Sequence, residues 1–524
     1  MLFYPYNTLP KRDDIVEHQC SLAAYFRGGS ESTMSGGGER IVRNSLYGIV
    51  GQVVGGGIIF LVVLLSARYL GPSEFGVFSF SFAIVAVIHM FAGGLTNILV
   101  REIARDLNSL HQVLGAVIPL MAIISVLTVL AVFACVNLLE VGTKTANTIY
   151  ILVGTLPISF LSAVHTAVCR AHEEMEFNAL ALIIQRVTLL CSVLVIIYLD
   201  AGLLGIAFSY LVAYVIQWFF YTTLVRRRYC RYRWRVDIAY WLYLLREGIP
   251  MAFGMMLQRI SSYAGVFALT LLSTASAVGL YSSAYRLIEM LAIIPYTLSH
   301  PLFPALSRLA ETSTDAAFDL YLQAQKYLIL MALPLGLWVC LFAPLLMSLL
   351  LGPQYEAAAG TLRILGLVVI LSFLNSLFLY MYSAVGAQRQ YTIIMSLTLV
   401  IHVILALVFI PLFDFNGAAL AALISECLLW LIATLLLRTR GFRPSRLMKH
   451  WPVIPAILLS GLPLLWPLKD PSLATLVPSS LLAGIVYLAA IYKFDLVTEA
   501  EIKTLLASRS RGSGLAQRAG DNPV

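Results

Sequence analysis

The chain has 524 residues, of which 60% are apolar and only 12% are charged, and its net charge is +8. A soluble protein of this length needs a charged surface, so the composition excludes a soluble enzyme and indicates a protein that crosses a membrane many times. The apolar runs are continuous and 18 to 27 residues long. Each can cross the roughly 30 Å hydrocarbon layer as a helix, and the alternating pattern of barrel strands is missing. We therefore expect an all-α integral membrane protein.

Residues 1–43 come before the first apolar run. They are polar, include the stretch "GGSESTMSGGG" and have no apolar core of the kind that a signal peptide requires. We expect them to form a disordered cytoplasmic extension. A start at Met34 would leave a short basic lead into the first span, so the sequence leaves both Met1 and Met34 open as the start of translation.

The rest of the chain predicts about fourteen transmembrane helices. In chain order the expected spans are 45–67, 75–97, 112–138, 150–169, 180–199, 203–225, 248–272, 278–304, 327–351, 359–384, 391–413, 416–437, 451–468 and 473–492. Three adjacent glycines, Gly55 to Gly57, lie in the first of them and indicate either a bend or close helix packing.

The positive charges indicate how these spans are oriented. Lys and Arg collect in cytoplasmic loops, and with both termini cytoplasmic 28 of the 35 fall on that side. Only Arg68, Lys144 and Lys469 face outside. We therefore expect a multi-pass protein of the inner or plasma membrane. The net charge follows from this topology and implies no nucleic-acid partner, although the basic run 226–235 could also contact anionic lipids.

Several chemistries find no support in the sequence. The seven cysteines include no CxxC pair, which leaves no metal site, and no Walker loop is present for ATP. The outer loops are short, the longest being about a dozen residues around "EVGTKTANT". An enzymatic domain has no place there, so we expect neither an enzyme nor a bound cofactor.

An internal repeat becomes visible when the sequence is shifted by 203 residues. Gly76 then falls on Gly279, Phe78 on Tyr281, and a second similarity pairs 199–218 with 413–430. The offset spans six helices, so the copies are parallel repeats. This pattern predicts two six-helix lobes related by a pseudo-twofold axis normal to the membrane, with a substrate path between them.

The repeat divides the chain into expected regions. After the 1–43 extension, these are an N-lobe at 44–225, a basic cytoplasmic linker at 226–247, a C-lobe at 248–440, two extra spans within 441–493 and a cytoplasmic tail at 494–524.

Three stretches resemble a known family. The run "NSLYGIVGQVVGGGIIFLVVLLSARYLGPSEFGVFSFSFAIVAV", the "REIAR" that follows the second span, and "LLGPQYEAAAGTLRILGLVVIL" are similar to Wzx-type polysaccharide flippases. These flippases belong to the multidrug/oligosaccharidyl-lipid/polysaccharide (MOP) superfamily. The resemblance covers roughly 44–442.

The resemblance implies a central cavity lined by spans one, two, seven and eight. Through it an oligosaccharide linked to a polyprenyl diphosphate would pass from the cytoplasmic to the outer leaflet. Membrane lipids and a glycan polymerase or glycosyltransferases of the same pathway are the implied partners. Such a cavity needs cations for the diphosphate, polar groups for sugar hydroxyls and an apolar side open to the lipid tail.

Two arginines lie deep enough to bind the diphosphate. Arg259 is about 17 Å into span seven and Arg286 about 12 Å into span eight, at 1.5 Å per residue. Charge at that depth is costly, so neither is expected to face lipid. Arg286 could instead pair only with Glu289, one turn away. Arg259 follows Gln258 and has no acid nearby in its own span, which favours substrate contact.

Other intramembrane polar residues are further candidates. Arg68, Arg101 and Arg186 could contact the diphosphate, although Arg68 and Arg186 could also reach the membrane surface and Arg101 could serve topology alone. Residues that could meet sugars are Asn97, Tyr263 and Asn375. Residues that could couple transport to proton or ion movement are His89, Glu289, His402 and Glu426, and helix–helix hydrogen bonding is the alternative for the histidines and Glu426.

Rival functions remain open at this stage. A lipid II flippase has a similar plan and the same number of spans. A multidrug exporter would be expected to carry a carboxylate in its first lobe, yet the first two spans contain no Asp or Glu up to Phe91 apart from Glu74 in the outer loop. A membrane enzyme of polysaccharide assembly is disfavoured by the short outer loops.

Overall fold

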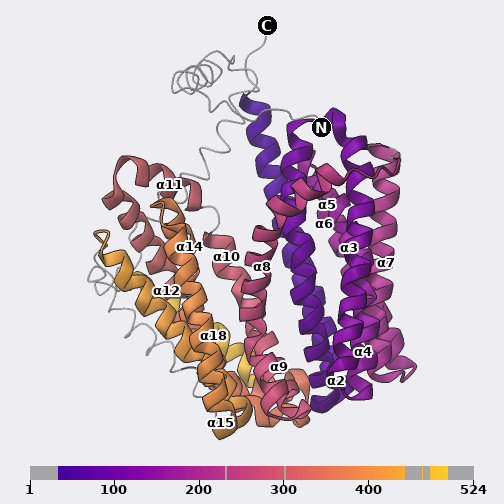
Figure 1. Cartoon of the computed structure of the whole chain (residues 1–524). Helices are drawn as coiled ribbons and strands as arrows, with labels where there is room; N and C mark the ends of the chain where they lie inside the picture. Colours follow the sequence, from indigo (N-terminus) through magenta and orange to yellow (C-terminus); the bar gives the residue numbers. More distant parts are fainter. Residues whose placement is uncertain (1–33, 231–232, 300–301, 443–462, 464–472, 494–524) are drawn as a thin grey trace, which may run out of the picture.

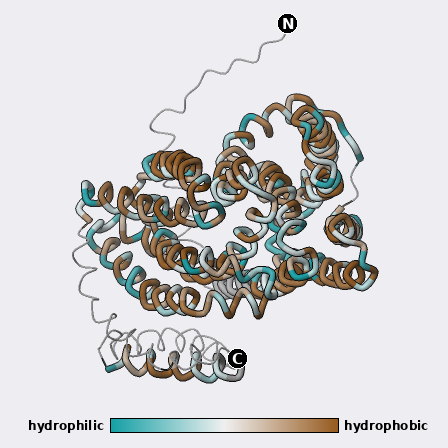
Figure 2. Tube along the Cα trace, turned by 90° about the horizontal axis from the view of Figure 1, so that it is seen from below, coloured by the Kyte–Doolittle hydropathy of each residue, from teal (hydrophilic) through white to brown (hydrophobic). Residues whose placement is uncertain are grey.

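The computed structural model describes residues 34–230, 233–299, 302–442, 463 and 473–493, and these contain no strand. The helices form two groups that lie close together at the bottom of Figure 1 and apart at its top, and hydrophobic residues run along almost every helix (Figures 1 and 2). The main helices are α2 (Met34–Arg105), α3 (Leu110–Leu138), α4 (Thr143–Val153), α5 (Thr155–Ala171), α6 (Met175–Tyr198), α7 (Gly202–Arg228), α8 (Ile238–Leu272), α9 (Ala275–Glu289), α10 (Ile293–Ser299), α11 (Phe303–Thr312), α12 (Thr314–Leu346), α13 (Ala359–Asn375), α14 (Phe378–Ala384), α15 (Gln388–Arg438) and α18 (Leu473–Lys493).

The described helices coincide with most of the expected spans. Ten helical segments of the described chain are long and apolar enough to cross a membrane. The two longest, α2 and α15, each consist of two helices, because the chain turns at Gly71 in α2 and at Asp414 in α15. Described helices therefore occupy the positions of the twelve spans expected between 45 and 437, except that residues 300–301 of the eighth lie outside the described part. The last span corresponds to α18, and the expected span 451–468 lies outside the described residues.

The start of α2 differs from the expectation. The helix begins at Met34, so residues 34–43 are helical rather than disordered, and the other residues of the expected 1–43 extension lie outside the described part. Helix formation is cooperative, so the apolar span can propagate its hydrogen-bond ladder into a polar lead. The three glycines lie in continuous helix. A Cβ at Gly55 would lie 3.2 Å from Leu182 of α6, which favours close packing over a bend there.

We call α2–α7 the N half and α8–α15 the C half. In each half an aspartate with a left-handed backbone links the end of the first helix to the fifth-to-sixth turn. Tyr69 Oη donates to Asp200 Oδ1 at 2.7 Å, and Ser273 Oγ donates to Asp414 Oδ1. The φ angles of Asp200 and Asp414 are 52° and 51°, a region that Asp tolerates better than most residues. The second sequence similarity, between 199–218 and 413–430, thus has a structural counterpart.

The end of the bundle that carries Gly71 and Asp414 is called the hairpin face. Here the two halves meet through backbone, and α9 lies beside the turn of α2 at the bottom of Figure 1. A Cβ at Gly76 would lie 1.7 Å from Ala275 O, and one at Gly279 would lie 1.8 Å from Pro72 O. The 203-residue repeat pairs these same two glycines, so the contact is reciprocal. Only glycine allows the helices to approach this closely.

The opposite end carries the basic linker and is called the linker face. Here the second helix of α2 packs on α8, since a Cβ at Gly94 would lie 2.4 Å from Ala252 Cα. The 203-residue repeat relates Gly94 to Thr297 and Ala252 to residue 49, so the equivalent contact in the other repeat would join residue 49 and Thr297. Gly48, next to residue 49, has open space around its Cβ position, and Thr297 is exposed. The two halves are therefore packed asymmetrically at the linker face.

The linker is fixed to the N half at its beginning and end. Arg228 Nη2 lies 2.7 Å from Glu174 Oε1, and Tyr229 Oη donates to the same carboxylate. Burial raises the pKa of the Glu174 carboxyl, but the Tyr229 hydrogen bond and the Arg228 charge outweigh it and hold that pKa below its ordinary value. At the other end Trp241 Nε1 donates to Ala116 O at 2.7 Å.

The reciprocal glycine contact yields a first prediction. In Gly76→Val the side chain cannot fit against Ala275, so the hairpin face should open. Val278 is only 1% exposed beside this contact. In a chain freed of its native cysteines, Val278→Cys should react with an impermeant maleimide about tenfold faster when Gly76→Val is added, the factor given by a shift of about 1.4 kcal/mol.

The control is Gly142→Val in the α3–α4 loop, where a Cβ meets no atom within 4 Å. It should leave the Val278→Cys reaction rate unchanged. Equal rates for Gly76→Val and Gly142→Val would show that the glycine contact does not close the hairpin face.

Candidate functional site

Arg259 lies on α8 between the two halves of the protein. Its Nη1 is 3.8 Å from Glu289 Oε1, and its guanidinium lies over the ring of Tyr263, 5.4 Å from the centroid. The Arg259 side chain is 34% exposed, and its Nε has no hydrogen-bond partner within the described residues. The arginine is therefore only partly compensated. The sequence offers Arg259 no acid nearby in its own span, 248–272, and Glu289 comes from the neighbouring α9.

Arg286 on α9 is much more fully paired. Its Nη1 lies 2.5 Å from Glu289 Oε2, and its Nη2 donates to Tyr263 Oη at 3.2 Å. The guanidinium also lies over the ring of Phe82, 5.4 Å from the centroid. The expected alternative, in which Arg286 pairs with Glu289 one turn away, matches this geometry. Glu289 thus pairs with two arginines, and its contact with Arg259 is the longer and weaker of the two.

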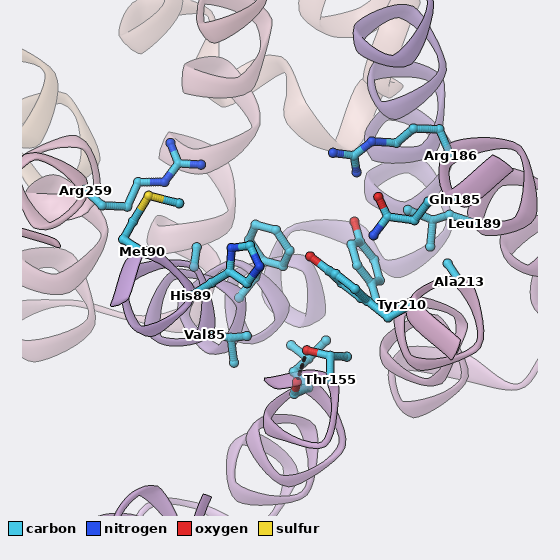
Figure 3. Close-up of a pocket in the computed structure, with 14 residues that line it drawn as sticks. Val85, His89, Met90, Thr155, Gln185, Arg186, Leu189, Tyr210, Ala213 and Arg259 are labelled. Carbon is cyan, nitrogen blue, oxygen red and sulfur yellow. Dashed lines mark hydrogen bonds between the residues drawn. The ribbon is translucent and has the colours of Figure 1, made fainter. Parts of the chain in front are cut away.

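A pocket of about 180 Å³ opens in the N half, and Arg259 reaches it from the C half (Figure 3). Its walls come from five helices of the N half and from α8. The lining residues are Phe82, Val85, Ala86, His89, Met90, Leu152, Thr155, Gln185, Arg186, Leu189, Tyr210, Ala213, Tyr214 and Arg259.

The polar side chains of this pocket have few partners. Thr155 donates its hydroxyl hydrogen bond to Leu152 O. No hydrogen bond or ion pair joins the side chains of Gln185, Arg186, Tyr210 or His89 to the described part of the protein. Buried polar groups normally have partners, so these side chains are available to a ligand or to water.

Two arginines give the pocket a positive character. In Figure 3 the guanidinium groups of Arg259 and Arg186 lie on opposite sides of the space that His89 and Tyr210 face. No carboxylate is among the described residues that line it. The Arg186 side chain therefore points toward the pocket that it lines. A dianion between two guanidinium groups would be favourably placed.

The remaining candidates lie elsewhere. Asn375 Nδ2 donates to Glu426 Oε2 at 2.5 Å inside the C half, and His402 Nε2 is buried there without a described partner. Arg101 Nη2 donates to Tyr243 Oη at 3.2 Å at the linker face and lies 3.5 Å from Glu247. Four of the expected residues thus lie apart from the pocket.

Four further candidates are also outside the pocket. Asn97 Nδ2 lies 4.0 Å from Met255 Sδ on the α2–α8 contact. Arg68 is exposed at the hairpin face, and Gln258 is exposed beside Arg259. Tyr263 is buried and contacts both arginines. Within the described residues, no group of three or more His, Cys, Asp or Glu could hold a metal ion.

The sequence interpretation does not include Gln185, Tyr210, Tyr214 and Thr155. Tyr210 and Tyr214 are four residues apart on α7, so they share a helix face, and Gln185 adjoins Arg186. Polar and aromatic residues in mid-span are the signal that points to them. The sequence alone could not show that these faces converge.

Comparison with solved structures defines the class of protein. The fold matches the "Lipid II flippase MurJ, inward closed conformation" with a TM-score of 0.70, 15% identity, and coverage of 86% of this chain and 98% of that one. It also matches an inward-facing multidrug resistance MATE family transporter of the MOP superfamily, with a TM-score of 0.63, 20% identity, and coverage of 78% and 99%. The chain is thus an all-α, multi-pass membrane protein with the fold of MOP transporters.

Comparison of sequences then gives the family. Residues 41–310 match the family model described as polysaccharide biosynthesis protein, and the chain belongs to that family. Over 366 residues it is 23% identical to the "Putative O-antigen transporter" of Shigella flexneri, covering 66% of this chain and 85% of that protein. The expected resemblance is confirmed, and the relatives found by both comparisons are described as transporters or flippases and not as enzymes.

The shared carboxylate leads to a second prediction. Arg286→Met removes the closest partner of Glu289, so the free energy of unfolding should fall by about 2 kcal/mol, as for other buried charged groups that lose a hydrogen bond. Adding Glu289→Gln should recover part of the loss, because the carboxylate left without Arg286 is then gone. Thermal unfolding of the purified protein in detergent measures both.

Arg68→Met is the matched control, since Arg68 is exposed and its replacement should change stability by less than about 0.5 kcal/mol. The pairing would be unimportant for stability if Arg286→Met and Arg68→Met had the same unfolding temperature.

Proposed function

We propose that the protein translocates a polyprenyl-diphosphate-linked oligosaccharide from the cytoplasmic to the outer leaflet for cell-surface polysaccharide synthesis. The observation that carries this proposal is the cationic site between the halves, where Arg259 and Arg186 face one pocket without a carboxylate in its described lining. The family, the O-antigen transporter and the lipid II flippase fold support the same class of substrate.

In this proposal Arg259 binds the diphosphate. A guanidinium binds phosphate oxygens bidentately and stays charged when it is partly desolvated. The expected helper is Arg286, but Arg286 is already paired with Glu289 at 2.5 Å. Arg186 has no described partner and faces the same space, so it is the better second cation. Arg286 and Glu289 then position Arg259 from behind.

The proposed movement is alternating access between two lobes, 44–225 and 248–440, joined by the linker 226–247. In the present state the hairpin face is held closed by the reciprocal glycine contact. At the linker face the second helix of α2 packs tightly on α8. The first helix of α2 lacks such a tight contact with α10. The diphosphate could enter there while the lipid tail stays in the membrane.

We also propose the orientation. The linker face is cytoplasmic, both termini are cytoplasmic, the membrane is the inner or plasma membrane, and 441–493 adds two spans before a cytoplasmic tail at 494–524. The charge distribution supports this orientation. Partner glycosyltransferases or a glycan polymerase would act on either side of the transport step.

A second candidate is transport of lipid II, since the fold resembles the lipid II flippase at a TM-score of 0.70. Both substrates present a polyprenyl diphosphate, so Arg259 would have the same role. The two functions differ in the sugar and peptide that follow the diphosphate. Restoration of peptidoglycan synthesis in cells depleted of their own lipid II flippase would favour this alternative.

The third prediction tests Arg259 directly. Arg259→Ala should reduce flipping of a polyprenyl-diphosphate-linked sugar in proteoliposomes by about 10- to 100-fold, which corresponds to the loss of a charge-assisted hydrogen bond. Arg259→Lys should keep part of the activity, because lysine retains the charge but not the bidentate geometry.

Arg246→Ala is the control on the same helix, since Arg246 is exposed near the linker face. It should flip at the wild-type rate. Wild-type flipping by Arg259→Ala, at equal protein in the liposomes, would rule out this residue as the diphosphate ligand.

The fourth prediction tests orientation. Arg233→Cys lies in the linker and Thr143→Cys at the end of the α3–α4 loop, and both positions are exposed. An impermeant maleimide should label Thr143→Cys in intact cells and Arg233→Cys only after permeabilisation. The reverse pattern would invert the proposed direction of transport.

A further inference from the structure

The pocket behind Arg259 contains more polar groups than a diphosphate requires. Gln185 and Tyr210 are each only 5% exposed, yet neither side chain has a hydrogen bond to the described part of the protein. His89 and Tyr214 also face the pocket without such a bond, and their rings lie 6.3 Å apart. These groups lie beyond the two arginines and have no role in the proposed binding of the diphosphate.

Their chemistry differs from that of an anion site. An ionised phosphate or carboxylate only accepts hydrogen bonds, so a site for an anion needs donors alone. The Gln185 amide and the tyrosine hydroxyls can both donate and accept. The walls also carry aromatic rings, including Phe82 and Tyr210 with centroids 5.5 Å apart. A ligand with several hydroxyl groups on an otherwise apolar ring satisfies both features. A sugar is such a ligand.

The size of the pocket limits the sugar to one ring. At about 180 Å³ it is smaller than the roughly 300 to 1,000 Å³ of pockets that enclose drug-sized molecules. At about 30 Å³ per molecule of liquid water, it could hold about six waters. A pocket of this size suits a single pyranose, with the rest of the glycan left in the space between the halves.

The position of the arginines indicates which sugar of the glycan would enter the pocket. Arg259 and Arg186 flank the same space that His89 and Tyr210 face (Figure 3). A diphosphate held by these two guanidinium groups would have the pocket directly beside it. The sugar that is covalently bonded to the diphosphate is the one close enough to enter.

We propose that this pocket binds the sugar residue directly bonded to the diphosphate. Gln185 and Tyr210 bind its hydroxyl or acetamido groups, and the surrounding rings pack on its apolar face. This inference rests on the proposed function, and it assigns recognition of the first sugar to the N half.

The test measures binding to the full-length protein in nanodiscs. The probes are polyprenyl diphosphate alone and the same lipid carrying one glucose, one galactose or one N-acetylglucosamine. The wild-type protein should bind at least one of the sugar-bearing lipids about tenfold more tightly than the bare diphosphate. Gln185→Leu should remove this difference, because leucine leaves the sugar hydroxyls unpaired. It should not alter the affinity for the bare diphosphate.

A second variant and a matched control complete the experiment. Tyr210→Phe removes one oxygen and should lower the preference for the sugar about fivefold, as expected for one lost hydrogen bond, again without a change for the bare diphosphate. Gln217→Leu carries the same substitution as Gln185→Leu on α7 outside the pocket, where Gln217 Nε2 lies 3.5 Å from Ala181 O. It should retain the wild-type preference.

The outcomes separate this inference from the proposed function. Equal affinity of the wild-type protein for all four lipids would overturn the sugar site, and so would an equal loss for bare and sugar-bearing lipids in Gln185→Leu and Tyr210→Phe. Failure of the proposed function looks different. The wild-type protein would then bind no diphosphate lipid, and Arg259→Ala would change nothing.

Discussion

The pairing of charged side chains between the two halves determines which ligands this protein can bind. Glu289 receives two arginines, and the closer one, Arg286, leaves Arg259 only a 3.8 Å contact. An ion in hydrocarbon is costly unless it is paired. One incompletely paired cation between the halves therefore favours an anionic ligand, and a second, Arg186, faces the same space. Replacing the carboxylate by a neutral group would make the site more positive but would also release both arginines from their present positions.

The two halves are related in sequence, but the site is not symmetric. By the 203-residue repeat, the partner of Arg286 is Ala83 and the partner of Arg259 is Gly56. The paired arginines thus belong to the C half, while the hydrogen-bonding groups without described partners lie in the N half. A ligand that bridges them contacts both halves at once. In the proposed mechanism such a ligand would couple binding to the relative position of the halves, as alternating access requires.

Much of the fold can be predicted from the sequence, because hydrophobic length and charge distribution are properties of single segments. The sequence separates the two spans within α2 and within α15 even though each pair forms one long helical stretch. The Arg286–Glu289 contact can also be anticipated, since residues three apart share a helix face. The N-terminal ten residues of α2 cannot, because polar glycine-rich sequence gives no periodic signal.

The candidate site is predictable only in part. Arg259 is identified by its depth in span seven, but its contact with Glu289 joins two helices, and periodicity within one helix does not show what it faces. Arg186 has a long side chain near a helix end, so reaching the surface and pointing inward are equally compatible with the sequence. Gln185 and Tyr210 come from different helices, and only packing of α6 against α7 brings them to one pocket.

The reciprocal contact between Gly76 and Gly279 also bears on the origin of the chain. Each glycine faces backbone of the other repeat, and the two contacts have nearly the same geometry, 1.7 and 1.8 Å for the added Cβ. Two identical subunits related by a twofold axis make such a pair automatically, because each residue of an isologous interface contacts its counterpart's surroundings. Gene duplication and fusion of a six-helix ancestor that paired with itself would carry this interface over intact, with a single ancestral glycine recorded twice in the modern sequence.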